Sequence, residues 1–206
     1  MSTYFDEAAR TWDTPEKVDR SRTIARAIAA SVPLQPDWDA LEYGCGTGQV
    51  TWNLADELRH VTLADTSEGM LDAVRARLAA EPSPRFSVAR LDLSIDPAPP
   101  VTYDLVYTVM ALHHIADVDR VLAEFHATLK PGGWLAIADL DADLEGHFHG
   151  EGHDGHHGFD RDDLAARVEA AGFSQPAVRT AATITKGPEG GPQRTFDVFL
   201  AVARRV

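Results

Sequence analysis

Short apolar segments alternate with amphipathic helical patterns along the chain, and this alternation constrains the fold more than any other feature. Strands are expected at residues 40–43, 61–64, 86–90, 103–109, 134–138, 178–184 and 196–203. Helices are expected at residues 15–32 and 49–58, after Ser67, after Asp117, and from Asp160 to residue 172. Such alternation is typical of βαβ units, in which helices cover a parallel sheet.

The expected fold class is therefore α/β. We predict a Rossmann-like, doubly wound, mostly parallel seven-stranded sheet with helices on both faces. The last strand should be antiparallel, because a short turn-rich link joins the last two strands. The 206 residues fit one domain. We expect an N-terminal lid and helix at 1–36, a cofactor-binding core at 37–145, a His/Gly-rich loop at 146–159, and a C-terminal helix and β-hairpin at 160–206.

Charge and cysteine content exclude several classes of partner. The formal net charge is −13, and such a surface repels nucleic-acid phosphates and anionic lipid. We therefore expect neither nucleic acid nor a membrane as partner. Cys45 is the only cysteine, so no internal disulfide is possible. No apolar run approaches the roughly 20 residues of a membrane span, and the N-terminus lacks a signal-peptide pattern. These observations predict a cytoplasmic protein.

The most informative segment is Leu-Glu-Tyr-Gly-Cys-Gly-Thr-Gly at residues 41–48, between an expected strand and an expected helix. Its glycines allow a sharp turn close to a ligand, and the helix start offers unpaired backbone N–H groups. A dinucleotide-binding loop would need its third glycine at position 49, where Gln49 stands. Together with Glu42, this disfavours an NAD(P) oxidoreductase and favours a positively charged ligand without phosphate.

Two further acids follow strands. Asp65 closes the second expected strand, at the distance where Rossmann-like folds hold a ribose with a carboxylate. Asp92 lies just past the third strand, where it could accept a hydrogen bond from an exocyclic amine. With Glu42, the three acids at successive strand ends indicate one adenosine-like ligand.

These motifs resemble the class I S-adenosylmethionine-dependent methyltransferases over about residues 38–173. The matching segments are residues 42–48, 63–70, 91–93, 103–107, Ala-Leu-His-His-Ile at 111–115, and Leu-Lys-Pro-Gly-Gly at 129–133. The resemblance implies transfer of a methyl group from S-adenosylmethionine to a small-molecule acceptor by in-line displacement, leaving S-adenosylhomocysteine. The alternative is a non-catalytic S-adenosylmethionine-binding sensor or partner subunit. Either a monomer or a homodimer is compatible with the sequence.

The resemblance also implies a set of cofactor-binding residues. Asp65 would hold both ribose hydroxyls, and Asp92 with Leu93 would hold the adenine. Thr108 would face the sulfonium end, and Met70 would pack on the adenine ring. The full set is Trp12, Glu42, Gly44, Cys45, Gly46, Gly48, Asp65, Thr66, Met70, Leu91, Asp92, Leu93 and Thr108.

The sequence says less about the identity of the methyl acceptor than about the cofactor. Residues 4–12 resemble the N-terminal lid of the small-molecule members, with Phe5 or Trp12 closing over the cofactor. The fourth strand is not followed by Asn-Pro-Pro-Tyr, which argues against amide or adenine-amine methylation in that style. A Pro-Cys pair for cytosine carbon chemistry is absent too.

Histidines are the candidates for the general base that some acceptors need. His113 and His114 follow the fourth strand, at the sheet edge where open α/β folds bind ligands. Further histidines gather in the His/Gly-rich loop at positions 147, 149, 153, 156 and 157. We assign the candidate catalytic role to His113, His114, His157 and His149.

Three readings of the His/Gly-rich loop remain open: a solvated lid, a proton-handling or substrate-contacting loop, and a divalent-metal site. The spacings match no compact zinc motif, so we assign no metal. If residues 139–143 are extended, the carboxylates of Asp139, Asp141 and Asp143 lie on one face.

Overall fold

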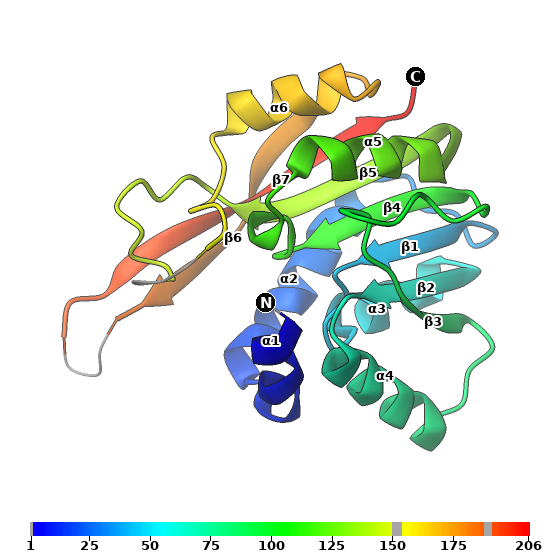
Figure 1. Cartoon of the computed structure of the whole chain (residues 1–206), viewed down its shortest axis with the longest axis horizontal. Coiled ribbons are helices and arrows are strands. Elements are labelled where there is room, and N and C mark those ends of the chain that lie inside the picture. The colour runs from blue at the N-terminus through cyan, green and yellow to red at the C-terminus, as the bar shows by residue number, and fades with distance from the viewer. Residues whose placement is uncertain (1, 150–153, 188–190) are drawn as a thin grey trace.

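The computed structural model describes residues 2–149, 154–187 and 191–206, and its centre is a seven-stranded sheet of order β3-β2-β1-β4-β5-β7-β6 (Figure 1). The strands are β1 (Asp39–Tyr43), β2 (His60–Asp65), β3 (Phe86–Arg90), β4 (Tyr103–Val109), β5 (Leu129–Leu140), β6 (Ala177–Lys186) and β7 (Arg194–Arg204). The first five strands pair in parallel, and β7 pairs antiparallel with both β5 and β6. The predicted Rossmann-like fold is confirmed, including its antiparallel last strand.

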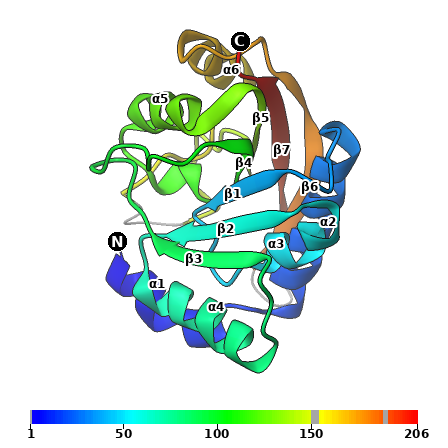
Figure 2. The same ribbon diagram turned by 90° about the vertical axis from the view of Figure 1, so that its right-hand side faces the viewer.

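Helices cover both faces of the sheet (Figure 2). They are α1 (Ser2–Ala8), α2 (Pro15–Ser31), α3 (Gln49–Leu54), α4 (Glu68–Ala80), α5 (Val118–Thr128) and α6 (Arg161–Ala170). Strand β1 shows how the two layers form, because successive side chains point to opposite faces. Leu41 packs in the core beneath α5 with Phe125, whereas Ala40 packs in the core beneath α2 with Ile28.

The predicted helix starts at Ser67, Asp117 and Asp160 are confirmed. Each of these side chains accepts a hydrogen bond from a backbone N–H of the first helical turn, at 2.9 to 3.2 Å. Such caps satisfy donors that a helix cannot satisfy by itself. The sequence therefore specifies these helix starts locally, without help from distant parts of the chain.

The structure differs from the predicted elements in three places. Strand β5 begins at Leu129 rather than at residue 134, because Gly132 N–H donates to the carbonyl of Arg205 and Arg205 N–H donates to that of Gly133. Helix α3 ends at Leu54 and continues as a 3₁₀ turn. Helix α1 was not predicted, since its seven residues are too few for a clear helical period.

The order of the sheet places a ligand crevice between β1 and β4. From β1 the chain builds outward through β2 and β3, and it then returns to add β4 and β5 on the other side. At such a reversal the loops after the two central strands diverge and leave space at the carboxyl ends of the strands. The helices of the described ranges all lack the length and apolar character needed to cross a bilayer.

Replacement of Phe125 by Ala should test the core beneath α5. The ring is fully buried and lies edge-on to Tyr43, with centroids 5.3 Å apart. We expect the free energy of unfolding, measured by urea denaturation, to fall by about 3–5 kcal/mol. Leu144→Ala is the control, because Leu144 is 96% exposed, and should change stability by less than about 0.5 kcal/mol. Equal effects of the two substitutions would contradict the proposed packing.

Candidate functional site

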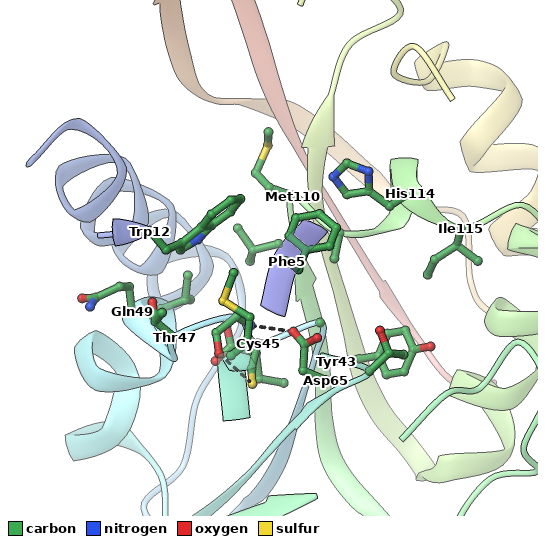
Figure 3. A pocket seen from close by; sticks show the side chains of 18 of the residues that line it. Phe5, Trp12, Tyr43, Cys45, Thr47, Gln49, Asp65, Met110, His114 and Ile115 are labelled. Carbon is green, nitrogen blue, oxygen red and sulfur yellow. Dashed lines mark hydrogen bonds between the residues drawn. The ribbon is translucent and has the colours of Figure 1, made fainter. Parts of the chain in front are cut away.

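A pocket of about 630 Å³ opens at the carboxyl edge of the sheet, where the loops after β1, β2, β3 and β4 meet the N-terminal segment (Figure 3). Its size suits a small-molecule ligand. Ten of the predicted cofactor residues line it: Trp12, Glu42, Gly44, Cys45, Gly46, Asp65, Thr66, Met70, Leu91 and Asp92. The fold thus brings together residues from four separate loops that the sequence analysis had assigned to one ligand.

The other three predicted cofactor residues, Gly48, Leu93 and Thr108, do not line this pocket. Gly48 has a φ of +79° and begins α3; a Cβ there would lie 2.7 Å from a methyl of Leu63. Leu93 is fully buried, and its N–H donates to the Tyr43 hydroxyl at 3.1 Å. Thr108 is buried inside the sheet, and its hydroxyl has no hydrogen-bond partner among the described residues. All three point into the protein rather than into the pocket.

The glycine loop after β1 is held in a conformation that other residues rarely adopt. Gly44 and Gly46 have φ values of +71° and +52°. A Cβ on Gly44 would come within 2.4 Å of the Ala111 side chain, so this loop packs directly on the loop after β4. Asp65 fixes the loop from the other side, since its carboxylate accepts from Gly46 N–H at 2.8 Å and from Ser67 N–H at 2.9 Å.

Glu42 lies in a buried polar network behind the glycine loop. The Thr51 hydroxyl donates to the Glu42 carboxyl group and lies 2.6 Å from the Tyr107 hydroxyl. Burial raises the pKa of Glu42 to about 8, so the side chain is mainly a neutral acid at pH 7. The negative charge that we had expected at Glu42 is therefore largely absent at neutral pH. Burial also raises the pKa of the Cys45 thiol, which disfavours a thiolate there.

The N-terminal segment closes one side of the pocket with two aromatic rings. Phe5 and Trp12 line the pocket with centroids 5.6 Å apart, and Phe5 also lies 5.1 Å from the ring of His114. Figure 3 shows Phe5 between Trp12 and His114. Met110, which lines the pocket too, has a φ of +54°, which is strained for a side chain of this size. The pocket therefore has an apolar wall on the side away from Asp65.

Two carboxylates that the sequence analysis missed attach this segment to the core. Asp6 accepts from the Ser67 hydroxyl at 2.6 Å and from Gly69 N–H at 3.0 Å. These hydrogen bonds lower the pKa of Asp6. Asp13 accepts from the Thr47 hydroxyl at 2.6 Å and from the Gln49 side chain at 2.7 Å. Each acid bonds to residues far away in sequence, so no local pattern could have indicated this role.

Two cations of α2 were missed as well. Lys17 and Arg20 line the pocket, and the ammonium of Lys17 lies 3.3 Å from the centroid of the Trp12 ring. The Arg20 guanidinium has no ion pair or hydrogen bond within the described ranges, and burial lowers its pKa. The two residues are three apart in the predicted helix 15–32, so they share one helical face. That spacing was the available signal.

Three of the four predicted catalytic histidines come together. His114 lines the pocket, and its ring centroid lies 4.0 Å from that of His113. The ring of His149 lies 4.8 Å from His113 and 5.6 Å from His114. His157 lies elsewhere: it is exposed and packs beside Gly146. The predicted loop member His153 lies outside the described residues.

The three acids at 139–143 have different partners instead of forming one carboxylate face. Asp139 is buried beside His113, with 2.5 Å between Oδ1 and Nδ1. Asp141 accepts two hydrogen bonds from Arg161, at 2.6 and 2.7 Å. Asp143 accepts from the N–H of Phe148 at 2.7 Å. Because β5 ends at Leu140, the strand period does not extend over all three acids.

Comparisons with known proteins agree with this geometry. Residues 41–135 match the methyltransferase domain family. A demethylmenaquinone methyltransferase from Symbiobacterium thermophilum is 32% identical over 136 residues, which cover 63% of this chain and 54% of that protein. These matches, together with the fold, support a class I S-adenosylmethionine-dependent methyltransferase. Members of this family take S-adenosylmethionine as the methyl donor.

Other methyltransferases extend the likeness. A trans-aconitate 2-methyltransferase from Deinococcus radiodurans is 32% identical over 121 residues, covering 58% of this chain and 44% of that protein. The chain spans about half the length of these two curated relatives. A methyltransferase solved in complex with a methyltransferase activator of Haloferax volcanii has the same fold, with a TM-score of 0.80 and 20% identity over 98% of this chain and 97% of that one.

Replacement of Glu42 by Gln should remove a pH dependence of stability. The pKa of Glu42 rises from its usual 4.5 to about 8 on folding, so between these values the folded state holds a proton that the unfolded state releases. The free energy of unfolding should therefore fall as the pH rises through this window, by at most about 1.4 kcal/mol per pH unit. Urea denaturation at intervals from pH 5 to pH 8 measures this. If the free energies of unfolding of the wild type and Glu42→Gln differ by the same amount at every pH, the raised pKa of Glu42 is contradicted.

Proposed function

We propose that the protein transfers the methyl group of S-adenosylmethionine to a small-molecule acceptor by in-line displacement. The observation that carries the proposal is the convergence of the glycine loop, Asp65 and Asp92 in one pocket beneath the aromatic rings of Phe5 and Trp12. Loops after three parallel strands supply the polar groups, and the N-terminal segment supplies the apolar cover.

The residues of the pocket fit the cofactor. Gly46 keeps open the space between the lid and Met70, because a Cβ there would lie 3.8 Å from Trp12 Nε1 and 4.0 Å from the Met70 sulfur. The backbone of the glycine loop would hold the methionine part, Asp65 the ribose hydroxyls, and Asp92 the adenine amine. When bound, S-adenosylmethionine supplies an activated methyl group on a positively charged sulfur.

The protein then has three tasks: to align the acceptor with the S–CH₃ bond, to exclude water, and to take a proton where the acceptor has one to lose. Phe5 and Trp12 exclude water from the side of the pocket that the N-terminal segment closes. The acceptor lone pair forms the new bond to the methyl carbon while the C–S bond breaks and its electron pair stays on sulfur. His114 lies in the pocket wall beside Phe5, where it could take the acceptor's proton.

The acceptor is proposed to be an anion, such as a carboxylate or a phosphate ester. Acids gather at the part of the pocket assigned to the cofactor, whereas Lys17 and Arg20 line its α2 side. In the part of the chain that the structure describes, no acid pairs with the partly desolvated Arg20 guanidinium, which favours a negatively charged ligand. Arg binds carboxylate and phosphate in bidentate geometry. The relative from Deinococcus radiodurans is named for trans-aconitate, a polycarboxylate, which supports the same class.

Asp65→Ala should weaken cofactor binding. Calorimetric titration of the wild type with S-adenosylmethionine and S-adenosylhomocysteine should show saturable binding, with NAD as a non-binding control. Loss of charged hydrogen bonds to the ribose should weaken both ligands by at least about tenfold. Asp72→Ala, an exposed acid on α4, should bind as the wild type does. A thermal melt of each variant checks folding. Failure of the wild type to bind either adenosyl ligand would refute the proposed function.

Arg20→Gln should weaken binding of the acceptor and leave binding of the cofactor unchanged. Formation of S-adenosylhomocysteine is measured with a panel of small carboxylates and phosphate esters, each paired with a neutral amide or alcohol. Only the anions should turn over, and Arg20→Gln should raise their KM by about tenfold or more. Arg22→Gln is the matched control, because Arg22 is exposed on the same helix and pairs with Asp19. Equal turnover of the neutral partners would contradict an anionic acceptor. No turnover of any compound, despite cofactor binding, would favour the non-catalytic alternative.

A further inference from the structure

We propose that His113, His114 and His149 form a binding site for a divalent first-row transition metal. Each histidine offers one ring nitrogen, and these nitrogens all lie within 4.8 Å of one another. In a tetrahedral site with metal–nitrogen bonds of 2.0–2.1 Å the nitrogens are about 3.3 Å apart, so they would have to approach by at most about 1.5 Å. Two of the three belong to the turn after β4, and the third belongs to the loop after β5.

The position of Asp139 supports a metal site more specifically than three neighbouring rings do. Its carboxylate is fully buried and accepts from the backbone N–H of His113 at 3.2 Å and from that of Leu140 at 2.7 Å. Its other contact is with Nδ1 of His113, at 2.5 Å. Because a carboxylate accepts, this contact suits the tautomer with its proton on Nδ1, and the ring lone pair of that tautomer is on Nε2. Metal-binding histidines usually have this second partner, which fixes the ring and increases its basicity.

The ligand set indicates the class of metal. Three neutral imidazoles suit Zn²⁺, Co²⁺, Fe²⁺ or Ni²⁺, whereas Mg²⁺ and Ca²⁺ prefer oxygen ligands. Three protein ligands leave at least one coordination position open, as in metal sites that bind a substrate or water. The sequence analysis assigned no metal because the spacing fits no compact motif. The structure shows why spacing was uninformative, since folding brings together ligands from two different loops.

The open position of this site would border the proposed acceptor pocket. His114 belongs to both the histidine cluster and the pocket wall, and its ring also contacts Phe5 of the lid. An acceptor with an oxygen donor could therefore be held by the metal at one point and by Arg20 at another. With the metal bound, His114 would act as a ligand and not as the base, because its single ring lone pair cannot bind both a metal and a proton. This use of the metal rests on the proposed methyl transfer; the metal site itself does not.

Metal binding can be measured directly. The protein is stripped with a chelator, dialysed, and titrated with Co²⁺ while the visible absorption bands of the bound ion are recorded; Zn²⁺ competition and Mg²⁺ are measured in parallel. We expect one Co²⁺ per chain, displaced by Zn²⁺ and unaffected by Mg²⁺. His149→Ala and His114→Ala should each lower the Co²⁺ affinity by about tenfold or more.

His147→Ala is the matched control. It removes an exposed histidine of the same loop, two residues from His149, whose ring lies 3.0 Å from the Glu145 carboxylate. This variant should bind Co²⁺ as the wild type does. Asp139→Asn tests the positioning role, because a weaker partner for His113 should change the absorption spectrum of bound Co²⁺. The proposal is overturned if the wild type binds no stoichiometric Co²⁺ or Zn²⁺, or if His114→Ala and His149→Ala bind as tightly as His147→Ala.

The same proteins separate this inference from the proposed function. Asp65→Ala should bind S-adenosylmethionine more weakly and keep Co²⁺, since Asp65 lies on the other side of the pocket and is no member of the histidine cluster. Wild-type protein that binds Co²⁺ but no adenosyl ligand would refute the methyl transfer and leave the metal site standing. Protein that binds the adenosyl ligands but no metal would refute the metal site and leave the proposed methyl transfer standing.

Discussion

The site depends on one partly buried carboxylate, Asp65, at the end of β2. Its two oxygens accept from Gly46 N–H and Ser67 N–H, so one side chain joins the glycine loop after β1 to the start of α4. Burial raises the pKa of Asp65, and these hydrogen bonds oppose that rise by favouring the charged form. Ser67 in turn donates to Asp6 of the N-terminal segment. The sheet, the glycine loop and the N-terminal segment are therefore connected through Asp65, Ser67 and Asp6.

Local sequence predicted most of the fold because local physics determines it. Strand periods, glycine turns and the three capping residues each act within a few residues, and the capping residues are confirmed. The errors occur where distant segments decide the outcome. Strand β5 is longer than predicted because Leu129 pairs with Tyr103 and Arg205 pairs with the backbone of residues 132 and 133, and no pattern near residue 132 predicts these pairings.

The same distinction separates the parts of the site that were predicted from those that were missed. The strand-end motifs place Asp65 and Asp92 in the pocket, because parallel strands bring their carboxyl ends to one edge. Thr108 also follows the strand period, but that period turns it into the core. Asp6 and Asp13 reach the site only through tertiary packing, so their roles could not be predicted from spacing.

The pocket presents positively charged side chains, although the protein as a whole is strongly negative. The net charge of −13 predicts weak affinity for anions, yet Lys17 and Arg20 present cations to the pocket at the carboxyl edge of the sheet. A local field in a low-dielectric cleft outweighs distant surface charges, because solvent and salt screen the latter over about 10 Å. The acidic surface would then reject anions elsewhere. An anionic acceptor would meet favourable potential beside α2, in the pocket that His114 also lines.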